Sequence, residues 1–175
     1  MELYSRDELD FPQDLVYETL RDNLPEIAQG LPNVKKIDVE SREEEGSVVR
    51  IVNRWHGVGE IPKAVQTVIK PDMLSWIDRA VWNGDDHTCH WDLEVMFFKD
   101  KIKCSGVNYY KVLGPDRTSI EITGNLDISV KGIRGVPRLL EKKLSSQIEK
   151  FLGKLITPNM GNVNKKLDEY LRARR

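Results

Sequence analysis

The sequence has few cysteines and no long hydrophobic run. Its two cysteines, Cys89 and Cys104, lie in strand-like segments and do not make a disulfide framework, so we expect both to be small buried residues. No apolar run approaches the ~20 residues that a membrane-spanning helix requires. Residues 1–7 are polar and lack the basic region and apolar core of a signal peptide. A cytoplasmic location is the resulting expectation.

Motifs for common enzyme chemistries are also missing. The chain has no Gly-x-Ser-x-Gly elbow and no Cys/His signature of a nucleophilic enzyme. The glycines of residues 132–135 follow no strand–helix unit that holds phosphate. His56, at the end of a predicted strand, is the best remaining candidate for an acid or base, although a histidine in that place is more often simply exposed. We therefore expect a binding protein rather than an enzyme.

One stretch, residues 85–90 (Asp-Asp-His-Thr-Cys-His), has the composition of a metal site. In a strand its two histidines, His87 and His90, would point to opposite faces. No second pair of ligands lies elsewhere at the spacing of a zinc site. We interpret the stretch as a turn that leads into a strand, and expect neither a metal nor an organic cofactor.

The composition is that of an ordinary soluble protein, and the charge is unevenly distributed. The 175 residues are 39% apolar and 31% charged, which predicts a single domain over residues 1–175. Residues 131–175 carry 12 Lys and Arg against 4 acids, a net charge of +8, while residues 1–130 carry −9. A basic C-terminal helix could contact an anionic membrane, but a run of charge is more often simply the solvated face of a helix. The segment lacks the aromatic residues of a nucleic-acid stacking surface, so we do not expect nucleic acid.

Alternating apolar residues and turn signals predict seven strands and several helices. The strands are expected at residues 1–10, 34–43, 47–56, 73–82, 88–98, 102–112 and 118–130. Pro12 opens a helix that Asn23-Leu24-Pro25 breaks, and a second short piece ends at Gly30. A further short helix is predicted at residues 62–70. The C-terminal segment from Ile133 onward has one apolar face, with an interruption expected at residues 157–161.

Two strand registers follow from the alternation. Pairing Val39 with Ile51 places Ile37, Val39, Val49 and Ile51 on one face of the sheet. Pairing Tyr110 with Ile120 places Gly106 opposite Gly124. Two facing glycines leave a notch, where a sheet can bend sharply or another element can approach closely.

The order of elements indicates an α+β fold. A curved antiparallel sheet of about six or seven strands must bury its concave face, and the long C-terminal helix is the natural filler. The two short N-terminal helices would close one end. Residues 8–22 (Glu-Leu-Asp-Phe-Pro-Gln-Asp-Leu-Val-Tyr-Glu-Thr-Leu-Arg-Asp) resemble the opening of START-like proteins of the SRPBCC superfamily, the Bet v 1-like helix-grip group. Residues 31–37 resemble that group's entry into its second strand, and the helix at 62–70 is similar to that of uncharacterised bacterial DUF2505-like members.

This resemblance implies a cavity between the sheet and the C-terminal helix. Proteins of the superfamily bind lipids, sterols, polyketides or quinones there, and some act as cyclases or aromatases. We therefore predict that a small hydrophobic ligand, such as a lipid, a quinone or a polyketide-like molecule, is held by side chains of the strands and helix. These are Ile51, Asn53, Trp91, Leu93, Val95, Phe97, Asn108, Tyr110, Ile122, Leu140, Leu144, Ile148 and Leu152.

Three hypotheses remain open at this stage. Asn53, Asn108 and Tyr110 lie on the apolar face, where they would orient a polar ligand group or bond a backbone group or a water. The first hypothesis is a carrier of an apolar ligand, and the second is a cyclase-type enzyme that uses Asn108, Tyr110 or His56. The third is a protein-interaction module with a filled core, because apolar periodicity does not distinguish a lined cavity from a packed one. A cavity below ~300 Å³ would favour the third hypothesis.

Overall fold

The computed structural model describes residues 1–63, 65–66, 69–129, 131–132 and 137–175. Within them, seven strands form one sheet that is accompanied by a short helix and a long helix. The strands are β1 (Glu2–Leu9), β2 (Val34–Glu45), β3 (Val48–Gly57), β4 (Ser75–Asn83), β5 (Thr88–Val95), β6 (Ile102–Gly114) and β7 (Arg117–Ile128). The helices are α1 (Gln13–Ile27) and α2 (Arg138–Arg172), with 3-10 turns at Pro71–Met73 and Lys99–Lys101.

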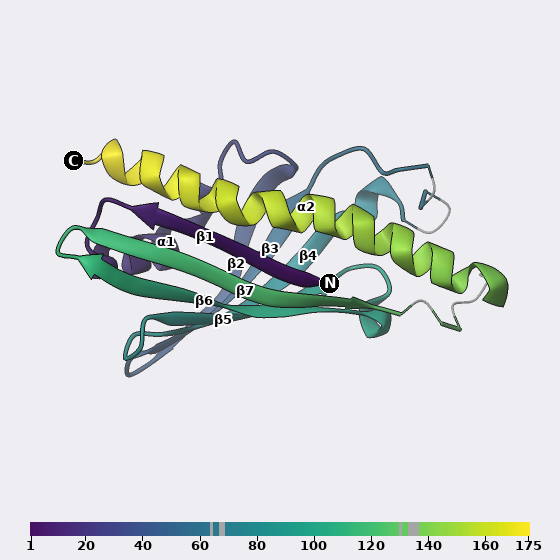
Figure 1. The fold of residues 1–175 in the computed structure, drawn as a ribbon, viewed down its shortest axis with the longest axis horizontal. Coiled ribbons are helices and arrows are strands. Elements are labelled where there is room, and N and C mark those ends of the chain that lie inside the picture. Colours follow the sequence, from purple (N-terminus) through teal and green to yellow (C-terminus); the bar gives the residue numbers. More distant parts are fainter. Residues whose placement is uncertain (64, 67–68, 130, 133–136) are drawn as a thin grey trace.

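The sheet is antiparallel throughout, in the order β1-β7-β6-β5-β4-β3-β2. It is strongly curved, and α2 lies along it from one end to the other (Figure 1). The C-terminal end of α2 meets α1, where the Tyr170 hydroxyl donates a hydrogen bond to Glu26 at 3.0 Å. The predicted α+β architecture of a curved sheet around a C-terminal helix is therefore confirmed.

The register predicted for the last two strands is confirmed residue by residue. Tyr110 pairs with Ile120 and Gly106 with Gly124. The notch at the two glycines holds a side chain of the neighbouring strand, the indole of Trp91 on β5. A Cβ atom at Gly106 would lie 2.3 Å from the Trp91 ring, and one at Gly124 would lie 2.7 Å from it. The glycines therefore allow an aromatic ring to lie flat against the sheet.

The register predicted for β2 and β3 is wrong by two residues. Val39 pairs with Asn53 instead of Ile51, and Ile37 pairs with Trp55. The error begins at the turn, because Glu45 pairs with Val48 and the turn is Gly46-Ser47 rather than residues 44–46. A bulge between Val39 and Ser41 then shifts the pairing by one residue. Val39 is 51% exposed, whereas Ile37, two residues earlier in β2, is buried.

The N-terminal helical region also differs from the prediction. One helix, α1, replaces the two short ones, because the chain stays helical on both sides of a kink. Asn23 leaves the helical region with φ −124° and ψ 18°, two residues before Pro25. A proline disfavours helical geometry in the residues ahead of it, so the predicted break is present as a bend.

The long helix α2 runs without interruption past the predicted breaks. It includes Pro158 and Gly161 and ends only at Arg172. Its 35 residues correspond to about 52 Å. Proline removes one intrahelical hydrogen bond, but apolar contacts of α2 on both sides of Pro158 hold the helix together. The predicted start at Ile133 lies outside the described residues.

The predicted helix at 62–70 cannot be compared in full, because residues 64, 67 and 68 lie outside the described residues. Of the others, Val65 and Ile69 are completely buried, and the Ile69 amide donates to the Val65 carbonyl at 2.9 Å. Both side chains pack in a cluster that includes Ile148, Phe151 and Leu152 of α2. None of the helices in the described part of the chain is long and apolar enough to cross a membrane.

Candidate functional site

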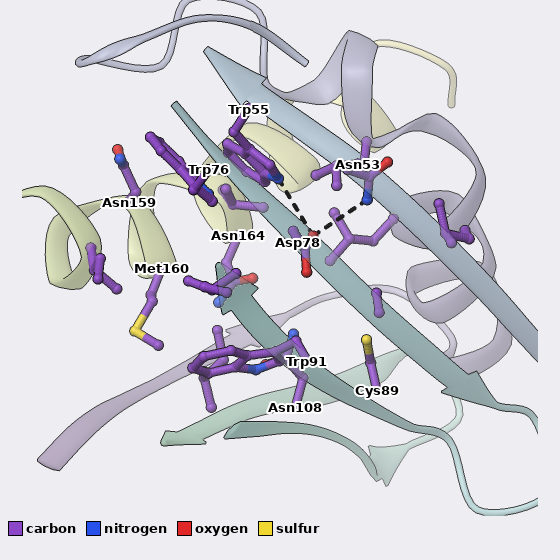
Figure 2. A pocket seen from close by; sticks show the side chains of 18 of the residues that line it. Asn53, Trp55, Trp76, Asp78, Cys89, Trp91, Asn108, Asn159, Met160 and Asn164 are labelled. Atoms are coloured by element: carbon purple, nitrogen blue, oxygen red, sulfur yellow. Dashed lines mark hydrogen bonds between the residues drawn. The ribbon is translucent and has the colours of Figure 1, made fainter. Parts of the chain in front are cut away.

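A cavity of about 170 Å³ lies between α2 and the concave face of the sheet. Strands β3 to β7 form its floor, α2 its roof, and Leu20, Arg21 and Leu24 of α1 close one end. Figure 2 shows side chains of the lining. Most of them are apolar, so the cavity favours a ligand that is itself mainly apolar.

A second hollow is wider but is a poorer candidate. It measures about 390 Å³ and is lined by residues that include Leu15, Asp116, Tyr170 and Arg174. It lies on the surface at the outer side of α1, where none of the buried polar atoms without a partner is found. A concave site with convergent polar groups is the better binding candidate, so the inner cavity is the candidate site.

Eight of the thirteen residues predicted to bind a ligand line this cavity. They are Ile51, Asn53, Trp91, Leu93, Val95, Asn108, Ile122 and Leu152. They come from four strands (β3, β5, β6 and β7) and from α2, so the alternation of the strands correctly indicated the face that they share. Their contact with a ligand stays a prediction.

The other five predicted residues lie elsewhere. Tyr110 is buried in the core under α1, and Ile148 is completely buried in the cluster of Val65 and Ile69. Leu144 packs against that same cluster, and Phe97 belongs to it while lining a minor hollow of about 20 Å³. Leu140 is 51% exposed near the first turn of α2. The apolar face of α2 is thus longer than the cavity that it covers.

Asp78 is the chemically important residue that sequence reasoning missed. It projects from β4 into the cavity and is buried. Its Oδ2 accepts hydrogen bonds from Asn53 Nδ2 at 3.3 Å and from Trp55 Nε1 at 3.4 Å. Its Oδ1 is buried without a partner, and Figure 2 shows this oxygen turned away from the two donors.

The surroundings of Asp78 disfavour its charged form. Burial raises the pKa of the carboxyl to about 6, and the hydrogen bonds from Asn53 and Trp55 oppose this shift without cancelling it. Among the described residues, no Lys, Arg or His forms an ion pair with Asp78. Arg21, which reaches the edge of the cavity, is held by Asp22 at 2.8 Å. At neutral pH the cavity therefore contains a carboxylate without a counterion.

The other polar side chains of the cavity are largely committed to neighbours. Asn108 Oδ1 accepts a hydrogen bond from Trp91 Nε1 at 2.8 Å, which fixes the indole over the glycine notch. Asn164 of α2 donates to Asp7 of β1 at 2.7 Å. Asn159, one helical turn earlier, is different, because its Oδ1 is buried without a partner.

Aromatic rings provide much of the apolar wall. The indoles of Trp55 and Trp76 stack with centroids 5.5 Å apart. Figure 2 shows this pair on one side of Asp78 and Trp91 on the other. Trp76, Ala80 and Trp82 alternate along β4 with Asp78 among them, so the position of Asp78 on the inner face was readable from the sequence.

Two further predictions concern histidines. His87 bonds Asp14 at 2.7 Å, and His56 bonds Asp38 at 2.8 Å, so neither projects into the cavity. His87 has a φ of 51°, which places it in the predicted turn before β5. In the described part of the chain, no three His, Cys, Asp or Glu side chains gather as they would around a metal ion.

Comparison with solved structures identifies the fold. The Zhui aromatase/cyclase from Streptomyces sp. R1128 superposes with a TM-score of 0.69 and 18% identity over 99% of this chain and 96% of that chain. Norcoclaurine synthase from Thalictrum flavum gives a TM-score of 0.66 and 10% identity over 100% and 88% of the two chains. A START superfamily protein from Mycobacterium smegmatis gives 0.52 and 15% over 99% of each chain.

No protein-family model and no curated protein sequence matches the chain. The resemblance to DUF2505-like proteins therefore has no support from sequence comparison. At these identities the structural likeness establishes the fold and leaves the function open. The neighbours of this chain are START-like and Bet v 1-like proteins, and it shares their helix-grip fold.

Proposed function

We propose that the protein binds a small, mainly apolar molecule in the cavity under α2. The observation that carries this proposal is the cavity itself, an unfilled and mostly apolar space in an otherwise closely packed interior. Protein interiors normally leave few voids larger than a water molecule, because each void forfeits packing contacts. A space of this kind that ends at a buried carboxylate is typical of a binding site.

The volume limits the ligand. About 170 Å³ is below the range of roughly 300–1,000 Å³ that drug-sized ligands occupy. An engineered cavity of roughly 150 Å³ in another protein holds benzene. The ligand that fits this form of the protein is therefore about the size of one aromatic ring. A lipid, a tailed quinone or a polyketide would need α2 to move away from the sheet.

The volume is also below the ~300 Å³ under which we expect an interaction module with a filled core. The experiment must therefore distinguish ligand binding from that second role. Ala80 lies on the cavity floor, and Ala80→Phe would fill much of the space. Val81→Phe, on the opposite face of the same strand, is the matched control. We expect toluene to shift the amide NMR signals around the cavity in the wild type and in the control, but not in Ala80→Phe.

Absence of binding in the wild type would contradict the proposal. If toluene and other single-ring compounds leave the NMR spectrum unchanged, and native mass spectrometry of the gently purified protein shows no bound small molecule, the interaction module is the better explanation. Thermal unfolding of Ala80→Phe checks that its loss of binding does not reflect loss of the fold.

A cyclase- or aromatase-type enzyme is the second candidate, and Asp78 favours it. A carboxylate with a raised pKa inside a cavity is suited to accept a proton from a bound substrate. His56 and Tyr110 do not reach the cavity, so the acid–base role would fall to Asp78 rather than to the residues considered from sequence. Turnover of a poly-β-ketone thioester that Asp78→Asn abolishes would support this function.

Contact with an anionic membrane is a separate proposal about the start of α2. Leu139 is 96% exposed and Leu140 51% exposed, and both lie beside the cations Arg138, Lys142 and Lys143. Exposed leucines next to lysines are suited to the surface of an anionic bilayer. We expect co-sedimentation with phosphatidylserine vesicles, its loss in Leu139→Ser/Leu140→Ser, and no binding to neutral vesicles. Equal binding of the wild type to both kinds of vesicle would contradict this role.

A further inference from the structure

The free oxygen of Asp78 indicates which end of a ligand the cavity recognises. A buried polar atom without a partner is costly, and proteins usually pair such atoms with each other or with water. Asp78 Oδ1 has no partner, although Oδ2 of the same carboxylate accepts two hydrogen bonds. An ionised carboxylate only accepts hydrogen bonds, so its missing partner is a donor.

The charges around Asp78 make a cation the most suitable donor. The groups that face it on the neighbouring strands are the amide of Asn53, the indole of Trp55 and the thiol of Cys89, all of them neutral. The Asp92 carboxylate, on the outer face of β5, adds negative potential from the far side of the sheet. From α1, only Arg21 brings a positive charge, and it is paired with Asp22.

The walls of the cavity agree with this polarity. Trp55 and Trp76 stack on one side of Asp78, and Trp91 lies on the other (Figure 2). The faces of indole rings carry negative potential and attract organic cations, more strongly where water is excluded. Asn159, on the roof, adds a second buried oxygen that lacks a donor. The faces of the indoles favour a cation, and the Asn159 oxygen favours a hydrogen-bond donor.

We infer that the cavity selects a single-ring arylalkylamine, whose ammonium group donates to Asp78 Oδ1 while its ring occupies the apolar space. This inference rests on the proposed binding function and specifies its ligand class. A neutral ring of the same size would fill the space and leave the carboxylate without a partner. A ring that carries a carboxylate would place two negative charges together.

Matched probes test this selection by isothermal titration calorimetry at pH 7. Benzylamine, toluene and benzoate share one ring and differ in the charge of the attached group. We expect benzylamine to bind about tenfold more tightly than toluene, and benzoate not to bind. Asp78→Asn should reduce benzylamine binding to the level at which the same variant binds toluene. Asp127→Asn, the control at an exposed carboxylate of β7, should keep the wild-type preference.

The outcomes separate this inference from the proposed function. If toluene binds as tightly as benzylamine, or benzoate binds best, the cavity is a binding site but the amine selection is wrong, and water is the partner of Asp78. If none of the three probes binds, the proposed function fails with it. Binding of benzylamine that Asp78→Asn leaves unchanged would place the ammonium away from Asp78 and would also overturn the inference.

The pH dependence provides a second readout. As the pH falls through about 6, Asp78 takes up a proton and loses its charge, so the preference for benzylamine over toluene should disappear. The Cys89 thiol, whose pKa burial raises, and the guanidinium of Arg21 keep their charge states over the same range. A preference that is the same at pH 5 and pH 8 would contradict the role of Asp78.

Discussion

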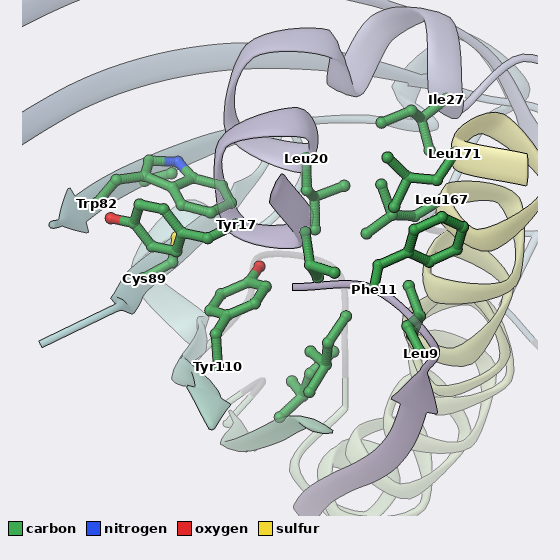
Figure 3. Close-up of a cluster of buried hydrophobic side chains, with 14 of the residues drawn as sticks. Leu9, Phe11, Tyr17, Leu20, Ile27, Trp82, Cys89, Tyr110, Leu167 and Leu171 are labelled. Carbon is green, nitrogen blue, oxygen red and sulfur yellow. The ribbon is translucent and has the colours of Figure 1, made fainter. Parts of the chain in front are cut away.

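The two halves of the interior contain similar residues, but one half is filled by side chains and the other contains the cavity. We call Phe11, Tyr17, Tyr110, Leu167 and Leu171 the packed cluster; they lie between α1, the sheet and the end of α2 (Figure 3). The ring of Tyr17 meets those of Trp82 and Tyr110 edge-on at 5.3 and 5.2 Å. The other half contains the cavity, with the four tryptophans Trp55, Trp76, Trp82 and Trp91 in its wall. The two halves differ in the element that covers the sheet, because α1 fills the concave face at one end, whereas α2 covers the cavity.

The largest expected effect concerns two leucines of α2, one in the packed cluster and one beside the cavity. Leu167→Ala should cost about 4 kcal/mol of unfolding free energy, because Leu167 is completely buried in the packed cluster. Leu152→Ala should cost about 2 kcal/mol, because Leu152 borders the existing cavity and has fewer contacts to lose. Urea unfolding measures both values. Equal losses would show that the two halves are equally well packed.

The second effect concerns Asp78, the buried carboxyl group in the half that contains the cavity. A folded pKa of about 6 against the ordinary 3.8 of an aspartate means that folding disfavours the charge, so stability is lost as the pH rises from about 4 through 6. Asp78→Asn should therefore stabilise the protein by up to about 3 kcal/mol at pH 7 and by much less at pH 4. Urea unfolding at both pH values checks this, with Asp127→Asn, a change to an exposed carboxylate of β7, as the control. If Asp78→Asn stabilises the protein equally at pH 7 and pH 4, the raised pKa of Asp78 is contradicted.

The smallest effect concerns the corresponding polar atom in the packed half. The hydroxyl of Tyr110 is buried without a hydrogen-bond partner. Tyr110→Phe should therefore raise the unfolding free energy by about 1 kcal/mol or leave it unchanged. Because Tyr110 does not line the cavity, binding of toluene and benzylamine should not change. A loss of binding in this variant would extend the site into the packed cluster.

The sequence predicted those parts of the fold that depend on local alternation. The predicted pairing of β6 with β7, which follows from the short turn at Gly114-Pro115-Asp116, was correct from Tyr110 to Ile102. The predicted pairing of β2 with β3 was wrong because the hairpin turns at Gly46 and Ser47, between the paired residues Glu45 and Val48, and not at residues 44–46. The break at residues 23–25 and the short helical piece beyond it were both anticipated, but not that the two pieces join as one kinked helix, α1.

The site was predicted less completely, for a physical reason. Asn53 and Asn108 were placed on the inner face, yet each one serves a neighbour, since Asn53 donates to Asp78 and Asn108 accepts from Trp91. Tyr110 was assigned to the ligand because alternation gives the face of a strand but not the helix that covers it. Asp78 was missed although its neighbours on β4 alternate with it.

Pro158 removes one hydrogen bond from the part of α2 that covers the cavity. The ring has no amide hydrogen, so the carbonyl of Lys154 lacks its usual partner in the helix. The residues of α2 that line the cavity run from Leu152 to Asn164, on both sides of this position. The roof of the cavity is therefore a stretch of helix with one backbone hydrogen bond fewer, while Leu167 anchors the following turns in the packed cluster.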